Sequence, residues 1–193
     1  RIDKKISNII YISSDAVYSD SFKKLNENSE TSSSSIHGMM HLTRELILKI
    51  YFKRLCIIRP TLVYGPGDTH KGYGPNLFLD LSKKNKNIVL FGKGEELRDH
   101  VYIDDLIKIL YECIVYNKQG IFNIASGKIN SFKKIAETIV HLSKSKSKIL
   151  TTKRVGLMPH NGYRSFDVSC IKKNFEKVKL TNIKEGIIKY LRK

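Results

Sequence analysis

Near its start, this chain carries two short apolar runs, rich in β-branched residues, on either side of a long crossover. Residues 8–13 and residues 55–59 each predict a buried strand, and Pro60 ends the second one. Between them, residues 14–36 predict a polar loop and residues 38–54 predict a helix. Two strands joined by a crossover with a helix are typical of a parallel sheet, so we expect an α/β fold.

The crossover helix has apolar residues at helical spacing, which we expect to face a core: Met40, Leu46, Ile47, Ile50 and Tyr51. Further along the chain, short apolar runs predict strands at 88–91, 100–103 and 120–124. Helical patterns predict helices at 76–84, 105–116, 132–142, 167–175 and 183–191. We expect the first of these helices to start near Pro75, and we expect Asp104 and Ser131 to cap the next two.

Composition limits the classes of protein to which the chain can belong. Its 193 residues, 41% of them hydrophobic, suffice for one domain or for one domain with a small second lobe. The net charge of +17 arises from 35 basic and 18 acidic residues. Because the lysines are spread along the whole chain, we favour solvated lysines over a nucleic-acid-binding surface and expect no nucleic-acid partner. A basic field would still attract an anionic substrate such as a diphosphate.

Cysteines and apolar windows exclude further classes. Cys56, Cys113 and Cys170 are isolated and odd in number, which argues against structural zinc and against a disulfide framework. No window is apolar enough to span a bilayer, so we expect no membrane partner. Residues 1–6 are basic without an apolar signal segment, and the chain has no initiator Met. We therefore expect a cytoplasmic protein and a fragment of a longer chain.

His37 and His41 lie four residues apart at the start of the crossover helix, so their side chains face the same side. This spacing suits a metal site or a pair of groups that move protons. The metalloprotease pattern HExxH fails because Gly38 replaces the glutamate, and a third ligand would have to come from elsewhere, such as His70, His100 or Glu45. We therefore predict no metal site. A histidine pair without chemistry is the other alternative.

Four motifs and a weaker fifth follow one another in order: YISSDAVY at 11–18, HGMMH at 37–41, RPTLVYGPGD at 59–68, FGKGE at 91–95 leading to RDHVYIDD at 98–105, and FNIASG at 122–127. Together they resemble the extended short-chain dehydrogenase/reductase family, which contains NAD-dependent nucleotide-sugar epimerases, dehydratases and reductases. The resemblance implies a partial Rossmann-like parallel sheet with a small α/β substrate-binding lobe. Residues 1–69 and 100–126 would form the second half of a Rossmann-type NAD(P)-binding domain, and residues 70–99 and 127–193 the lobe. The family's glycine-rich first half, which holds the cofactor pyrophosphate, has no counterpart in this sequence.

The same resemblance implies roles for individual residues. Ser14 would hydrogen-bond the reacting oxygen, while His37 falls at the family's catalytic tyrosine position and His41 at the position of its lysine. Ser13, Pro60 and Thr61, with both histidines, would contact NAD or NADP. The nucleotide-sugar substrate would be bound by Asn76, Arg98 and Arg164.

Alternatives stay open for several of these residues. Asn76 could cap a helix, both arginines could form surface ion pairs, and Ser14 could cap its own turn. We expect Glu45 to be structural, pairing with Lys49. Because neither expected residue occupies the tyrosine and lysine positions, the site has three outcomes: ordinary chemistry with histidine as the proton carrier, altered chemistry, or binding without turnover as a regulatory protein. Assembly as a homodimer is also left open.

Overall fold

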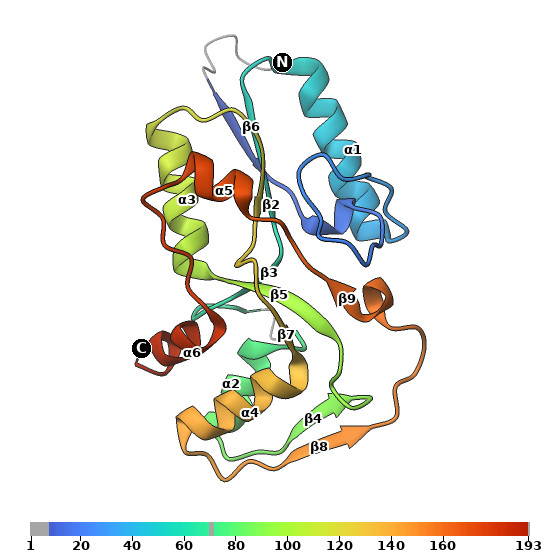
Figure 1. Cartoon of the computed structure of the whole chain (residues 1–193), viewed down its shortest axis with the longest axis vertical. Coiled ribbons are helices and arrows are strands. Elements are labelled where there is room, and N and C mark those ends of the chain that lie inside the picture. Colours follow the sequence, from blue (N-terminus) through green and yellow to red (C-terminus); the bar gives the residue numbers. More distant parts are fainter. Residues whose placement is uncertain (1–7, 70–71, 193) are drawn as a thin grey trace.

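A computed structural model describes residues 8–69 and 72–192 of the chain (Figure 1). The basic segment at residues 1–6 and His70, which entered the sequence predictions, lie outside the described residues.

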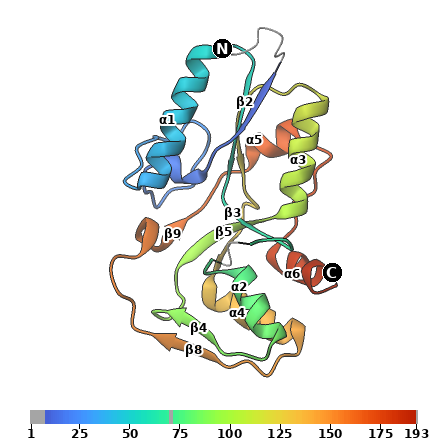
Figure 2. The same ribbon diagram turned by 180° about the vertical axis from the view of Figure 1, so that it is seen from behind.

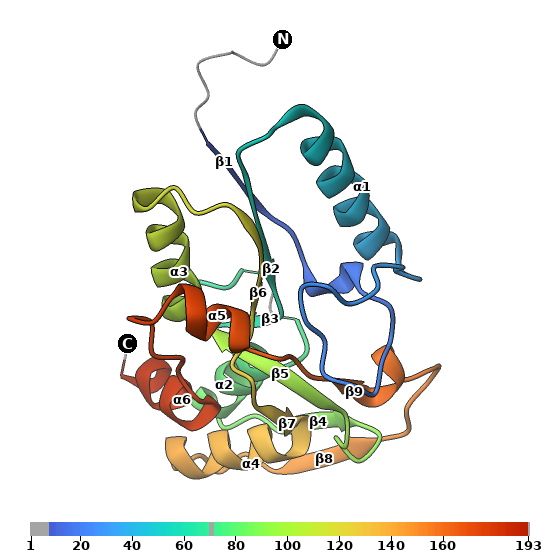
Figure 3. The ribbon, with the colours of Figure 1, turned by 45° about the horizontal axis from the view of Figure 1, so that its top comes forward.

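Three parallel strands form the first sheet, in the order β1 (Ile9–Ile12), β2 (Leu55–Pro60) and β6 (Gly120–Ile124). The crossover between the first two contains α1 (Ile36–Tyr51). Figure 2 and Figure 3 show that α1 lies on one face of this sheet, while α3 (Ile103–Val115) and α5 (Ser169–Asn174) lie on the other. The predicted α/β class and parallel sheet are therefore confirmed.

A second group of elements lies at the carboxyl end of these strands (Figure 1). Its sheet has the order β3 (Leu62–Tyr64), β5 (Leu97–Tyr102) and β7 (Ile129–Ser131), and β9 (Tyr163–Arg164) also pairs with β5. A separate parallel pair joins β4 (Ile88–Phe91) to β8 (Ile149–Thr152). The helices of this group are α2 (Pro75–Lys83), α4 (Phe132–Ser143) and α6 (Ile183–Leu191). Short 3₁₀ turns occur at η1 (Asp15–Val17) and η2 (Pro159–Gly162).

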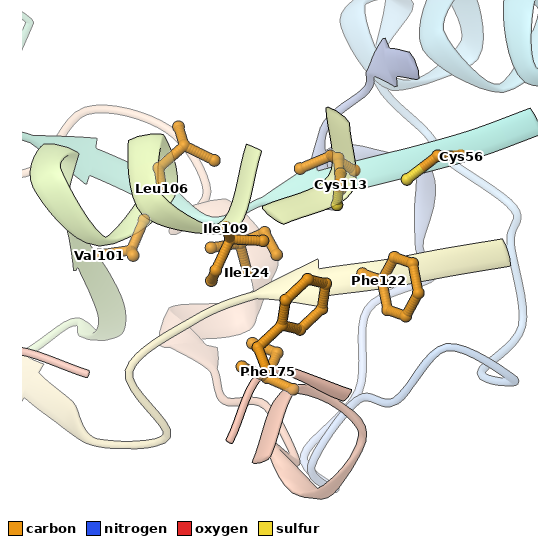
Figure 4. Close-up of a cluster of buried hydrophobic side chains, with 10 residues drawn as sticks. Cys56, Val101, Leu106, Ile109, Cys113, Phe122, Ile124 and Phe175 are labelled. Carbon is orange, nitrogen blue, oxygen red and sulfur yellow. The ribbon is translucent and has the colours of Figure 1, made fainter. Parts of the chain in front are cut away.

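Each of the two groups packs around a main hydrophobic cluster. The first packs β2 and β6 against α3 and α5, and its members include Cys56, Ile109, Cys113, Phe122 and Phe175 (Figure 4). The second packs α2 and α4 against β4. Although α5 lies in the sequence range predicted as the lobe, it packs in the first cluster. The predicted division into two domains stays a prediction.

The burial predicted from the sequence is wrong in two elements, β1 and α1. The predicted buried strand β1 is only partly buried, because it is an edge strand among the described residues, and its Ile12 is 49% exposed. In α1, none of the five apolar residues expected in a core is buried: Met40, Leu46, Ile47, Ile50 and Tyr51. The buried residues of this helix are Gly38 and Glu45.

Of the two predicted helix caps, one is confirmed by the structure and one is wrong. Ser131 caps α4 as predicted, with its hydroxyl accepting from the Lys134 amide. The predicted Asp104 cap is wrong, because α3 begins at Ile103 and both aspartates lie in its first turn. One of them, Asp105, accepts hydrogen bonds from the Thr181 amide and hydroxyl, so it anchors the segment before α6. Within residues 8–69 and 72–192, no helix has the length and apolar composition needed to span a bilayer.

Candidate active site

The loop after β1 and the amino-terminal end of α1 form one corner of the molecule. Ser13 and Ser14 follow the carboxyl end of β1, and the Ser14 hydroxyl accepts from the Ala16 amide at 3.2 Å, so it caps η1. The α1 end is capped by Ser35, whose hydroxyl accepts from the Gly38 amide at 3.0 Å. Capping of its own turn, one of the two interpretations of Ser14, is therefore present, and its predicted contact with a reacting oxygen stays a prediction.

Gly38 lets the helix approach this loop closely. A Cβ atom at this position would collide with the Ser33 side chain and with the Ala16 carbonyl oxygen. A residue larger than glycine would push the start of α1 away from η1, which packs against it. The glycine in the HGMMH motif thus lets the start of α1, with its histidines, pack against the loop that carries Ser14.

His37 and His41 contact each other edge to face, with ring centroids 4.7 Å apart. His37 is exposed and His41 is half-buried. From β1, the Tyr11 hydroxyl lies 2.9 Å from His41 Nδ1. Burial lowers the pKa of His41, and the charges of His37 and Arg44 lower it further, while Glu45 opposes them. The surroundings of His41 therefore favour the neutral form of its ring.

A buried polar network lies one helical turn further along α1. Glu45 accepts from the Ser13 hydroxyl at 2.6 Å and from both Nε and Nη2 of Arg59, at 2.9 and 2.5 Å. Arg59 Nη1 donates to the Tyr18 hydroxyl at 2.7 Å, and that hydroxyl donates to Asn123 Oδ1 at 2.7 Å. Burial alone would raise the pKa of Glu45, but the bonds from Arg59 and Ser13 outweigh it, so the pKa lies below its ordinary value. This network ties α1 to the ends of β2 and β6.

The predicted pairing of Glu45 with Lys49 is confirmed at 3.9 Å, but its main partner is Arg59, which sequence reasoning missed. Ser13 is buried and uses its hydroxyl in this network, so its predicted cofactor contact would require that bond to be exchanged.

Pro60 and Thr61 lie at the carboxyl end of the first sheet, where Pro60 pairs in register with Ile124. The Thr61 hydroxyl donates to the Asp99 carbonyl oxygen at 3.1 Å, and its amide donates to the Ile124 carbonyl oxygen at 3.0 Å. Thr61 thus joins the two sheets, next to Pro60 at the end of β2. Their contact with the cofactor stays a prediction.

A pocket of about 540 Å³ opens in the second group of elements. One wall is aromatic: the Tyr73 ring lies 4.7 Å from the ring of Phe91 and 4.7 Å from that of Phe132, between centroids. Another wall carries Arg98 and Arg154. A pocket with flat apolar rings beside guanidinium groups suits a ligand that joins a flat ring to an anion.

Glu96 lies between the two arginines of this pocket. Its carboxylate oxygens are 3.2 Å from Arg98 Nε and 3.3 Å from Arg154 Nη2. Arg98 is largely buried, and its Nη1 is a buried atom without a hydrogen-bond partner. Burial lowers the pKa of Arg98, while the charge of Glu96 raises it. Arg98 thus keeps a buried donor without a hydrogen-bond partner beside the pocket.

Asn76 lines a smaller adjoining pocket of about 190 Å³. Its Oδ1 accepts from the Gly65 amide at 3.0 Å, and its Nδ2 donates to Asp68 Oδ2 at 2.7 Å. The cap of α2 is Gly74, so the alternative of Asn76 as a helix cap is wrong. Asn76 instead holds the turn of the third motif against α2, at the edge of the pocket.

Arg164 on β9 pairs in register with Arg98 on β5, which places the two predicted substrate ligands on neighbouring strands. The Arg164 side chain is buried and donates to the Ser19 and Asp15 carbonyl oxygens and to the Asp15 carboxylate, the last at 3.3 Å. Arg164 therefore holds the loop after β1, and a role in diphosphate binding would require some of these bonds to be exchanged.

Sequence reasoning missed the contacts of Tyr11, Arg59 and Arg154. For Tyr11, the spacing of residues in the sequence could have indicated the contact. Tyr11 and Ser13 are two residues apart in the extended segment formed by β1 and the residue after it, and the residues they contact, His41 and Glu45, are four apart on the following helix. Among the described residues, no group of three or more His, Cys, Asp or Glu side chains is placed to hold a metal ion.

Comparison with known proteins gives a family match over most of the chain. The model of the NAD dependent epimerase/dehydratase family matches residues 2–125. A relative from Methanocaldococcus jannaschii is 30% identical over 144 residues, which cover 70% of this chain and 47% of that protein. The ADP-L-glycero-D-manno-heptose-6-epimerase of Fusobacterium nucleatum is 32% identical over 147 residues, which cover 64% of this chain and 43% of that protein. The chain thus spans less than half the length of these relatives.

Solved structures share the fold. The UDP-glucuronic acid 4-epimerase of Bacillus cereus, in complex with UDP-glucuronic acid and NAD, aligns with a TM-score of 0.84 at 22% identity, covering 97% of this chain and 62% of that one. At this identity the likeness concerns the fold alone.

Proposed function

Because the chain belongs to the NAD dependent epimerase/dehydratase family, we propose that it acts on a nucleoside diphosphate sugar as an NAD(P)-dependent epimerase, dehydratase or reductase. In this proposal, residues 1–69 and 100–126 form the cofactor side of the site, and residues 70–99 and 127–193 form the substrate side. The relatives and the aligned structure, whose names refer to nucleotide-sugar epimerases, support the same substrate class.

The pocket that contains Arg98 carries the proposal. Its volume of about 540 Å³ lies in the usual range of small-molecule sites. The rings of Tyr73 and Phe91 offer stacking surfaces to a nucleobase, and Phe132 packs against Tyr73. The unused Nη1 donor of Arg98 can bind a diphosphate oxygen, and a guanidinium keeps its charge even when partly buried.

The proposed chemistry places proton transfer on His37. Imidazole is the most frequent general acid and base in enzymes, and the exposed His37 ring is open to a sugar hydroxyl. We assign to Ser14 the hydrogen bond to the reacting oxygen, and to His41 a hydrogen bond to the cofactor ribose. A bound nicotinamide would supply the hydride acceptor and donor of such a reaction.

The residues present fit the nicotinamide side of a dinucleotide better than its pyrophosphate. Ser14, His37 and His41 gather at the carboxyl end of β1, where hydroxyl and imidazole groups can meet a ribose and its substrate. Within the described residues, the two glycine-rich turns, at 65–67 and 92–94, do not lead from a parallel strand directly into a helix. Pyrophosphate binding at a helix start needs that arrangement.

A binding or regulatory protein without turnover is the second candidate. What favours it is the environment of His41, where burial and the neighbouring His37 lower the pKa of the ring. A neutral imidazole gives a neighbouring acid less electrostatic help than the ammonium of a lysine would.

Isothermal titration of UDP, ADP and TDP into the chain tests nucleotide binding. We expect saturable binding of at least one, weakened about 10- to 100-fold in Arg98→Met, since a charged hydrogen bond contributes about 1.5–3 kcal/mol. Arg54→Met, an exposed arginine outside the pocket, is the matched control and should bind as the wild type does. No binding of any of the three, or equal affinity in Arg98→Met, would contradict the proposal. Conversion of UDP-glucose in the presence of NAD would separate the enzyme from the binding protein.

A further inference from the structure

Tyr11 and His41 form a contact that links β1 to the candidate active site. Tyr11 lies on β1 and its hydroxyl is 2.9 Å from His41 Nδ1, with the ring centroids 6.0 Å apart. The next pair along the same strand and helix is Ser13 with Glu45, at 2.6 Å. Tyr11 on β1 and Ser13 just after it thus meet two successive turns of α1, so the position of the helix against this segment is fixed at both contacts.

The direction of the bond follows from the chemistry of its two groups. A neutral imidazole has one nitrogen that donates and one that accepts. A phenol hydroxyl is the stronger donor of the pair and an imidazole nitrogen the stronger acceptor, which favours donation from the Tyr11 hydroxyl to Nδ1. Burial, with the neighbouring His37 and Arg44, lowers the pKa of His41 against the opposing Glu45, and Tyr11 faces the ring from β1.

We propose that Tyr11 is a positioning residue that fixes His41 in the tautomer with its proton on Nε2. The Nε2–H group, on the opposite side of the ring from Nδ1, is then a permanent hydrogen-bond donor in a ring that carries no charge. It can donate to a ribose hydroxyl, which is the task that the proposed function gives to His41, and the inference rests on that function for its consequence. His41 thereby replaces the hydrogen bond of a lysine and not its charge.

The opposite tautomer makes a different prediction. If Nδ1 carried the proton and donated to the Tyr11 oxygen, Nε2 would be left as an acceptor. Such a ring could accept from a ribose hydroxyl and could not donate to one. The two arrangements share the same heavy-atom positions, so they are distinguished by locating the proton.

Nitrogen NMR on the ligand-free chain, labelled with ¹⁵N in its histidine rings, locates that proton. The His41 signals are assigned by comparison with His41→Gln. We expect a protonated Nε2 and an unprotonated Nδ1 at pH 7.5 in the wild type. In Tyr11→Phe, which keeps the ring, the Nδ1 signal should move to the position of a nitrogen without a hydrogen bond. The pKa of His41 should rise by about half a unit to one unit, because a bond that favours the neutral form is lost.

Tyr51→Phe is the matched control, since Tyr51 lies exposed at the far end of the same helix. It should leave the His41 signals and pKa unchanged. A proton on Nδ1 in the wild type would overturn the proposal, and so would an unchanged Nδ1 signal in Tyr11→Phe. The wild-type spectrum decides the tautomer even where a variant fails to fold. Because no ligand is present, this outcome is independent of UDP binding, so failure here is distinguishable from failure of the proposed function.

Discussion

Replacing Glu45 by glutamine should destabilise the fold more than the replacement of any other polar or charged residue in α1. The Glu45 side chain is 0% exposed and that of Arg59 is 2% exposed, so the substitution leaves a buried guanidinium without its counter-charge. Breaking a buried ion pair by removing one partner typically costs about 3–5 kcal/mol. Against a total stability of about 5–15 kcal/mol, this is a large fraction. With an m-value of about 2 kcal/mol/M, the urea midpoint should fall by about 1.5–2.5 M.

A second variant makes this reasoning refutable. Glu45→Gln combined with Arg59→Met removes both buried charges, and replacing a whole buried pair is often neutral. The double variant should therefore be more stable than Glu45→Gln alone, and urea unfolding followed by far-UV circular dichroism measures both. Glu137→Gln, an exposed glutamate on α4, is the control and should unfold as the wild type does. A double variant no more stable than the single one would show that the lost counter-charge is not the cause.

The effect should also depend on pH. The pKa of Glu45 is lower in the folded chain than its ordinary value of 4.5, since the bonds from Arg59 and Ser13 outweigh the effect of burial. A group with a lowered folded pKa stabilises the fold above its unfolded pKa and loses this contribution as the pH falls toward the folded pKa. The stability difference between wild type and Glu45→Gln should thus be full at pH 7 and shrink below pH 4.5.

Three further predictions concern other parts of the chain. Gly38→Ala should lower the melting temperature by several degrees, because the new Cβ meets the Ala16 carbonyl oxygen, and a thermal scan by circular dichroism checks it. Burial lowers the pKa of His100 to about 3, so its contribution to stability is full above its unfolded value of 6.5 and falls by about 1.4 kcal/mol per pH unit below it. Between pH 7.5 and pH 5, the free energy of unfolding of the wild type should therefore fall by about 2 kcal/mol more than that of His100→Phe, as measured by urea unfolding. Equal losses in the two proteins would contradict this. In a protein with a complete cofactor site, His37→Phe should abolish turnover and leave NAD affinity nearly unchanged, and unchanged turnover would exclude His37 as the proton carrier.

The order of strands and helices could be predicted because it depends on local patterns. The runs at β2, β4 and β6 are mostly apolar, and each was found within one residue of its predicted bounds. The same is true of α4 and α6, where Ser131 and the periodicity mark the helices. Short strands such as β3 and β7 were missed, since three residues are too few to show an alternating pattern.

Burial in the site was harder to predict than element order. An apolar run does not show whether its strand lies at the edge or in the middle of a sheet, so β1 was taken as fully buried. The partners of Glu45 could not be identified from sequence spacing alone, because Arg59 reaches it from another strand end and Tyr18 from a loop. Motif order placed His37, His41 and Ser14 in one region, but the contact of Tyr11 with His41 depends on how a strand sits against a helix.

The orientation of α1 connects these observations. An amphipathic helix normally turns its apolar face inward, yet α1 directs Glu45 and, in part, His41 toward the sheet while Leu46 and Ile50 are exposed. Burying a carboxylate is unfavourable unless it is paired, so this orientation depends on Arg59 and Ser13 rather than on burial of apolar area. The same orientation brings His41 to Tyr11 and leaves His37 open at the corner of the site. The buried ion pair and the candidate active site are therefore two consequences of one helix orientation, and loss of the pair should disturb both.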